Sequence, residues 1–97
     1  MRVISKRTLR EYWEQNPDAQ GSLVAWHKEA DLAEWVSPQA VKAQHRNASF
    51  PGGNCVFFNI KGNDYRLVVR INYPYRVVYV RWVGTHEEYD EIDVTEV

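Results

Sequence analysis

Residues 54–83 have the sequence NCVFFNIKGNDYRLVVRINYPYRVVYVRWV, which is rich in β-branched and aromatic residues. Two turn-forming segments, 61–64 and 74–76, divide this stretch into three runs. Such runs, bounded by glycine, asparagine and proline, are typical of β-strands. We therefore predict strands over 54–60, 65–73 and 77–83, and the short connections between them imply an antiparallel meander.

The residues before this stretch follow a helical period. Leu9, Tyr12 and Trp13 recur at i, i+3 and i+4, which predicts a first helix over 6–15 with Ser5 as its N-cap. The segment Asn16-Pro17-Asp18 interrupts it, because the residue before a proline resists the α conformation.

A second helix is expected from Asp18, its candidate cap, to about residue 34. One apolar stripe supports it: Ala19, Leu23, Trp26, Ala30 and Ala33. Ser37 followed by Pro38 predicts a short third helix over 38–44. Residues 46–53, with Pro51 and two adjacent glycines, are expected to form a loop.

This order of elements predicts an α+β fold in which N-terminal helices pack on one face of a three- to four-stranded antiparallel sheet. Residues 1–4 are the candidate fourth strand. A chain of 97 residues fits a single domain over 1–97. Its one cysteine, Cys55, excludes an internal disulfide and a cysteine-pair zinc site, and we expect no cofactor. No apolar run is long enough to span a membrane and no secretory signal is evident, so a cytoplasmic protein is expected.

The charges are unevenly distributed, although the net charge is only −1. Between Trp35 and His86 there are seven Lys or Arg residues and one acid, which gives +6. From Glu87 to Val97 there are six acids and no base, which gives −6. A basic stretch of this kind indicates a polyanionic partner, whereas the alternative is a solvated sheet face whose charges only keep the protein soluble.

Side-chain alternation assigns the strand residues to two faces. Tyr65, Leu67, Val69 and Ile71 are expected to face the helices, together with Val56, Phe58, Ile60, Val78, Val80 and Trp82. The opposite face then carries Lys61, Arg66, Arg70 and Arg81, interleaved with Phe57 and Tyr79. Cations beside exposed rings are typical of single-stranded nucleic acid binding, although such rings are also common as cross-strand packing pairs.

The segment after the last strand, 84–90, has a high concentration of ionisable and hydroxyl side chains. His86, Tyr89 and Asp90 can take part in proton transfer there, just beyond the strand that carries Arg81. The alternative is structural: Thr85 caps a last helical turn in which Glu87 and Glu88 are favourable and His86 is merely exposed.

Several stretches resemble the HigB toxins of bacterial type II toxin–antitoxin systems, a branch of the RelE-like superfamily. They are 3–9 (VISKRTL), 46–50 (RNASF), 59–69 (NIKGNDYRLVV), 79–83 (YVRWV) and 84–90 (GTHEEYD). The resemblance implies a single RelE-like toxin domain with mRNA interferase activity. Such a protein enters the ribosomal A site, cleaves messenger RNA without a metal and is silenced by a HigA antitoxin. That antitoxin carries a helix-turn-helix DNA-binding domain, so contact with DNA would be indirect.

The resemblance also implies site residues. Arg66 and Arg81 would stabilise charge on the phosphate, and His86 and Tyr89 would transfer protons, with Asp90 orienting one of them. Which of the two acts as base stays open. The candidate RNA-binding residues are Lys61, Asn63, Arg70 and Tyr79. Lys61 would hold a flanking phosphate or lower the pKa of a neighbouring group.

Two other functions remain compatible with the sequence. A non-catalytic RNA- or ribosome-binding module would use the same basic face, and the presence of His86, Tyr89 and Asp90 argues against it. A structural protein could instead dock an acidic partner on that face. For the antitoxin, we expect apolar anchoring by one or two of Trp13, Trp26 and Trp35, because four tryptophans are many for so small a core.

Overall fold

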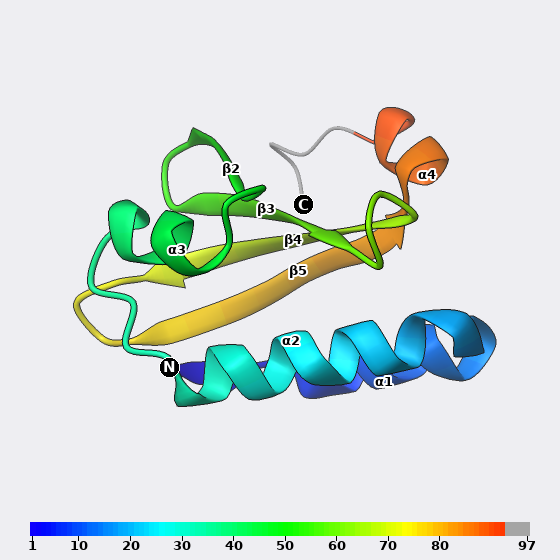
Figure 1. Cartoon of the computed structure of the whole chain (residues 1–97), viewed down its shortest axis with the longest axis horizontal. Helices are drawn as coiled ribbons and strands as arrows, with labels where there is room; N and C mark the ends of the chain where they lie inside the picture. Colours follow the sequence, from blue (N-terminus) through cyan, green and yellow to red (C-terminus); the bar gives the residue numbers. More distant parts are fainter. Residues whose placement is uncertain (93–97) are drawn as a thin grey trace.

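Three consecutive strands form the centre of the sheet in the computed structural model, which describes residues 1–92 (Figure 1). They are β3 (Cys55–Ile60), β4 (Tyr65–Asn72) and β5 (Val77–Thr85). Each pairs antiparallel with the next, so the predicted meander is confirmed. The turn between β3 and β4 pairs Ile60 with Tyr65 and therefore Asn59 with Arg66.

Two short strands complete a five-stranded sheet of order β1-β5-β4-β3-β2. β1 (Arg2–Ile4) pairs with β5 and is parallel to it, whereas β2 (Ser49–Gly52) pairs antiparallel with β3. The α+β class is confirmed, but the sheet is mixed and has one strand more than predicted. The expectation of a loop over 46–53 was wrong for β2, because an edge strand tolerates the proline and glycine that suggested a loop.

The helical layer consists of α1 (Lys6–Gln15), the 3₁₀ turn η1 (Pro17–Ala19) and α2 (Gln20–Leu32). α1 and α2 run side by side along one face of the sheet (Figure 1). The bounds predicted for the first helix are confirmed, although the Ser5 side chain makes no capping hydrogen bond. The second helix differs, since η1 takes up its first residues and Asp18 does not cap it.

Two further helices follow. α3 (Pro38–Gln44) has its predicted bounds and its predicted cap, because Ser37 Oγ accepts a hydrogen bond of 3.3 Å from the Ala40 backbone N–H. α4 (His86–Asp90) directly follows β5. No helix in residues 1–92 combines the length and the apolar character needed to span a membrane.

The main core lies between the sheet and the helical layer and contains two of the four tryptophans. Trp26 contacts the Phe58 ring edge-to-face at 5.4 Å, and Trp35 stacks on the same ring at 5.9 Å between centroids. Both indoles are buried, at 3% and 2% exposure, so neither is free to anchor a partner, and of the three candidates the prediction stays open for Trp13 alone. Trp13 is half-buried and packs against this core.

A β-bulge in β5 changes which residues face the helices. Val80 pairs with Val69 and Trp82 pairs with Val68, so Arg81 between them has no partner in β4. The extra residue resets the alternation. The predicted inward position of Trp82 was therefore wrong: Trp82 lies on the opposite face, and Val83 takes its place in the main core.

Candidate nucleic-acid interface

We call the face of the sheet opposite α1 and α2 the outer face, and a small apolar cluster forms its floor. Phe57 and Val68 are buried there with Cys55, and Trp82 and the Tyr89 ring of α4 pack against them. The register places Arg66 on one side of this floor and Arg70 on the other, both on β4. Strand geometry separates the two arginines by about 13 Å along β4.

Arg66 is half-buried and held between two aromatic rings. Its guanidinium carbon lies 4.5 Å from the centroid of the Tyr89 ring and 5.8 Å from that of Phe57, which is the range of cation–π attraction. Nη2 donates a hydrogen bond of 3.2 Å to Asn59 Oδ1, while Nε is buried without a partner among the described residues. Such a cation is fixed in place before any anion binds.

Arg70, Arg81 and Tyr79 occupy the other end of the outer face. Arg70 pairs with Tyr79 on one side and with Cys55 on the other, and the Tyr79 ring is 39% exposed. Burial raises the pKa of the Cys55 thiol, and the charges of Arg70 and Arg81 oppose this rise. Arg81 lies in the bulge opposite Val68 and Val69, two residues from Tyr79, whereas Arg66 pairs with Gly84 further along β5.

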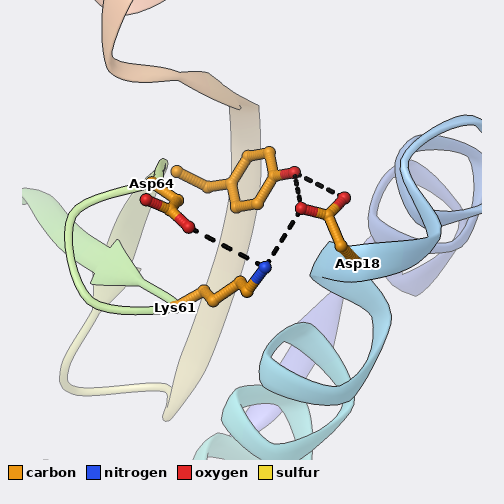
Figure 2. Close-up of polar contacts among 4 residues, drawn as sticks. Asp18, Lys61 and Asp64 are labelled. Carbon is orange, nitrogen blue, oxygen red and sulfur yellow. Dashed lines mark hydrogen bonds and ion pairs between the residues drawn. The ribbon is translucent and has the colours of Figure 1, made fainter.

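Lys61 does not lie on the outer face, which corrects its predicted position. Figure 2 shows its ammonium between two carboxylates, 3.2 Å from Asp18 Oδ2 and 3.8 Å from Asp64 Oδ2. The backbone of Lys61 is left-handed, with φ of 53°. Strand alternation therefore ends at Ile60 and no longer determines where the Lys61 side chain points.

Asp18 connects the helical layer to the end of β4. Both of its oxygens accept from the Tyr65 hydroxyl at 2.7 Å. The Tyr65 hydrogen bond, followed by that of Lys61, lowers the pKa of the Asp18 carboxyl, and the bond to Asp18 raises the pKa of Tyr65 to about 12. Burial and the nearby Glu88 carboxylate raise the pKa of Tyr12 to about 12.

A capping box fixes α4 at the end of β5. Thr85 Oγ1 accepts from the Glu88 backbone N–H at 3.1 Å, and Glu88 Oε1 accepts from the Thr85 N–H at 2.8 Å. The structural alternative for Thr85 is therefore confirmed. His86 is half-buried rather than merely exposed, and its Nε2 is buried without a partner among residues 1–92.

The candidate proton-transfer residues lie in different surroundings. Tyr89 contacts Arg66, whereas His86 lines a pocket of about 370 Å³ that it shares with Asn63. The other residues of this pocket are Asp18, Asp64, Tyr65, Thr85 and Glu87. Asp90 is exposed. In the described part of the chain, no three His, Cys, Asp or Glu residues are grouped so that they could hold a metal ion.

A known protein family matches most of this chain. Residues 19–92 match the family model described as HigB_toxin, RelE-like toxic component of a toxin-antitoxin system. The chain belongs to the HigB toxin family. Its fold is accordingly that of a RelE-like toxin.

Curated members of the HigB family are similar over nearly the whole chain. The mRNA interferase toxin HigB of Escherichia coli K12 is 29% identical over 93 residues, which cover 93% of this chain and 88% of that relative. The mRNA interferases HigB of Escherichia coli O157:H7 and Shigella flexneri match with the same values.

Phe57 was predicted on this face, and it holds Arg66. Two residues were missing from the sequence-based site: Asn59, which also holds Arg66, and Trp82, which packs against Tyr89. The signal for Asn59 was present, because a four-residue turn between Ile60 and Tyr65 already pairs Asn59 with Arg66. Trp82 could not be found in this way, since the bulge at Arg81 leaves no pattern in the sequence.

Proposed function

We propose that this protein is the toxin of a type II toxin–antitoxin pair and acts as an endoribonuclease on messenger RNA. The activity of its relatives supports this proposal, since they are named mRNA interferases. The observation that carries it is Arg66, a half-buried cation fixed by two rings and one amide. A cation preorganised in this way stabilises negative charge that develops on a bound phosphate.

The proposed reaction is attack of a ribose 2′-oxygen on the adjacent phosphate. A bond forms between that oxygen and phosphorus, and the bond from phosphorus to the 5′-oxygen breaks. One proton leaves the 2′-hydroxyl and one reaches the 5′-oxygen, so the products are a 2′,3′-cyclic phosphate and a 5′-hydroxyl end. The step needs charge stabilisation and two proton transfers, but no redox partner.

We assign charge stabilisation to Arg66 and the proton transfers to His86 and Tyr89, with Asp90 as the orienting group. The contact of Tyr89 with Arg66 supports a position for its hydroxyl beside the phosphate. His86 approaches from the neighbouring pocket, which also contains Asn63. Lys61 shares its charge with two carboxylates, so we expect a smaller contribution to phosphate binding from Lys61 than from an unpaired arginine.

The finer features follow the family resemblance. We propose that cleavage occurs in the ribosomal A site in the cytoplasm, without a metal. A HigA-like antitoxin with a helix-turn-helix domain would silence the toxin, and DNA would be contacted only through that partner. Docking in the A site supplies orientation and a restrained RNA, which together lower the barrier to in-line attack.

The test compares cleavage of ribosome-bound and naked messenger RNA by the purified protein. We expect the wild-type protein to cleave ribosome-bound RNA much faster. Arg66→Ala removes one charge-stabilising donor and should lower the rate about 10²- to 10³-fold. Arg10→Ala is the matched control, because Arg10 is exposed on α1 and has no ion pair within residues 1–92.

Three results would contradict the proposal. Cleavage by Arg66→Ala at the wild-type rate would show that the cleavage site is not on the outer face. Equal rates on naked and ribosome-bound RNA would refute the A-site step. Complete loss of the slow cleavage of naked RNA after addition of a metal chelator, with recovery on adding Mg²⁺ in excess of the chelator, would refute the metal-independent reaction; naked RNA is used because ribosomes themselves require Mg²⁺.

A further inference from the structure

The basic end of the outer face has features that the cleavage step does not use. Arg70 and Arg81 are exposed, and the register places Arg81 in the bulge opposite Val68 and Val69, which precede Arg70 in β4. No ion pair in residues 1–92 neutralises either of them. Like charges on neighbouring strands repel each other unless an anion lies between them. A bound anion would therefore stabilise this end of the face.

An exposed aromatic ring and a pocket lie beside Arg70. The Tyr79 ring, 39% exposed, lies beside Arg70 in the register. Next to both is a pocket of about 360 Å³, lined by Gly53, Asn54, Arg70, Ile71, Asn72 and Tyr79. An exposed ring beside phosphate-binding cations is the usual arrangement for holding an unpaired base.

We infer that Arg70, Arg81 and Tyr79 form a second RNA subsite, which binds a nucleotide that flanks the cleaved one. This inference rests on the proposed endoribonuclease function and specifies how its substrate is held. The phosphate of the flanking nucleotide lies at the two arginines, and its base stacks on Tyr79. The subsite is about 13 Å from Arg66 along β4, with Phe57, Val68 and Trp82 between them.

The β-bulge is part of this subsite. A bulge places an extra side chain on the strand, and such features are frequent beside functional sites. Here the extra residue is Arg81, which lies between Val80 and Trp82, opposite the step from Val68 to Val69 that precedes Arg70, whereas Arg66 pairs with Gly84. The inference therefore assigns Arg81 to substrate binding and leaves Arg66 as the cation at the cleaved phosphate.

RNA fits these residues better than an acidic protein segment does. Carboxylates would satisfy the arginines, but they would leave the Tyr79 ring and the adjacent pocket unused. A nucleotide uses all three features, because it has an anion and a flat base at a fixed separation. Stacking on one aromatic ring strengthens binding of a single-stranded nucleic acid about tenfold or more, whatever the base.

The experiment measures binding of a short oligoribonucleotide whose reactive 2′-hydroxyl is replaced by hydrogen, so that it cannot be cleaved. Fluorescence anisotropy gives the dissociation constant for each variant. We expect Tyr79→Thr to weaken binding about tenfold and Arg70→Gln to weaken it severalfold. Tyr79→Phe keeps the ring and should bind as the wild type does. Arg10→Gln removes an exposed charge from α1 and is the control.

A second measurement separates binding from chemistry. Cleavage of ribosome-bound RNA under single-turnover conditions gives a maximal rate and a half-saturating toxin concentration. Tyr79→Thr should raise the half-saturating concentration and leave the maximal rate unchanged, in contrast to Arg66→Ala. Equal unfolding midpoints for all variants ensure that folding is not the cause.

The possible outcomes are distinct. Unchanged oligoribonucleotide binding by Tyr79→Thr and Arg70→Gln would overturn the subsite, whether or not the wild type cleaves RNA. In that case, weaker binding of an acidic protein by the same variants would identify the other occupant. Weakened RNA binding together with absence of any cleavage by the wild type would keep the subsite and refute the endoribonuclease.

Discussion

The contact between Tyr65 and Asp18 joins two layers through a single pair of side chains. Asp18 is in η1 and Tyr65 is the first residue of β4, yet the hydroxyl lies 2.7 Å from both carboxylate oxygens. Lys61 adds a cation from the intervening turn. The contact requires an ionised Asp18 carboxylate and a protonated Tyr65 hydroxyl. The stability of this junction therefore depends on pH.

We predict that Asp18→Asn reduces the loss of stability in acid. The folded-state pKa of Asp18 is below its ordinary value of 3.8, so ionised Asp18 stabilises the fold above that pH. This stabilisation is lost as the pH falls below 3.8 and through the folded-state pKa. Urea unfolding at several pH values should show a smaller acid dependence in the variant, and the variant should be less stable than the wild type at neutral pH.

The alkaline side provides the control for this prediction. The pKa of Tyr65 is raised from 10.0 to about 12, so its contribution is complete below pH 10 and disappears as the pH rises toward 12. Tyr65→Phe should reduce the loss of unfolding free energy between pH 10 and pH 12. Because the two residues share one contact, adding Tyr65→Phe to Asp18→Asn should produce little further loss of stability. Fully additive effects of the two substitutions would contradict a shared contact.

At the scale of elements, the join between β5 and α4 depends on a glycine. A Cβ built on Gly84 would lie 2.5 Å from the far edge of the Trp82 indole and 3.1 Å from Glu88 Oε1. Trp82 packs against Tyr89, and Glu88 belongs to the capping box of α4. The absence of a side chain at Gly84 therefore makes room for the Trp82 indole and for Glu88 of α4 at the end of β5.

We predict that Gly84→Ala destabilises the protein by about 1–3 kcal/mol, because the methyl group forces Trp82 to move. The displaced indole disturbs Tyr89, so cleavage should fall as well. Thermal unfolding, followed by circular dichroism, measures the first effect. Gly21→Ala is the matched control in α2: nothing lies within 4 Å of its Cβ, and the variant should be more stable by about 0.5–1 kcal/mol. Equal unfolding midpoints for both variants would contradict this account.

The elements show what sequence reasoning can and cannot reach. α1, α3 and the three central strands follow from local periodicity and turn residues, and their predicted bounds were right to within two residues. β2 was missed because its pairing with β3, rather than its composition, makes it a strand. The predicted faces of Trp82 and Val83 were exchanged, because the unpaired Arg81 moves every later residue of β5 to the opposite face from the one that strict alternation predicts. Lys61 was misplaced because its backbone conformation is set by the turn.

At the scale of the whole molecule, charge is divided between two regions. The outer face carries Arg66, Arg70 and Arg81, whereas the residues after His86 are acidic. Of the six acids in that tail, Asp93 and Glu96 are outside the described residues, and the other four lie in or next to α4. One surface of a protein whose net charge is close to zero is therefore positively charged, which would attract a polyanion to that surface.

We predict the salt dependence of RNA binding from this distribution. Three arginine contacts to phosphates of a single strand give a slope of about −2 for the logarithm of the binding constant against the logarithm of salt concentration. Anisotropy titrations over a range of salt concentrations measure it, and Arg70→Gln should lower the magnitude of the slope by roughly one third. A slope near zero in the wild type would mean that the outer face does not neutralise phosphates.

The bulge at Arg81 also determines how this chain can diverge from its relatives. Without Arg81, Val80 and Trp82 would be adjacent and would still pair with Val69 and Val68, and every other residue of β5 would keep its face. Arg81 is therefore the position within β5 at which the loss of one residue preserves the pairing of the sheet. A variant of this chain that lacks Arg81 should therefore keep the same strand register and the same two faces.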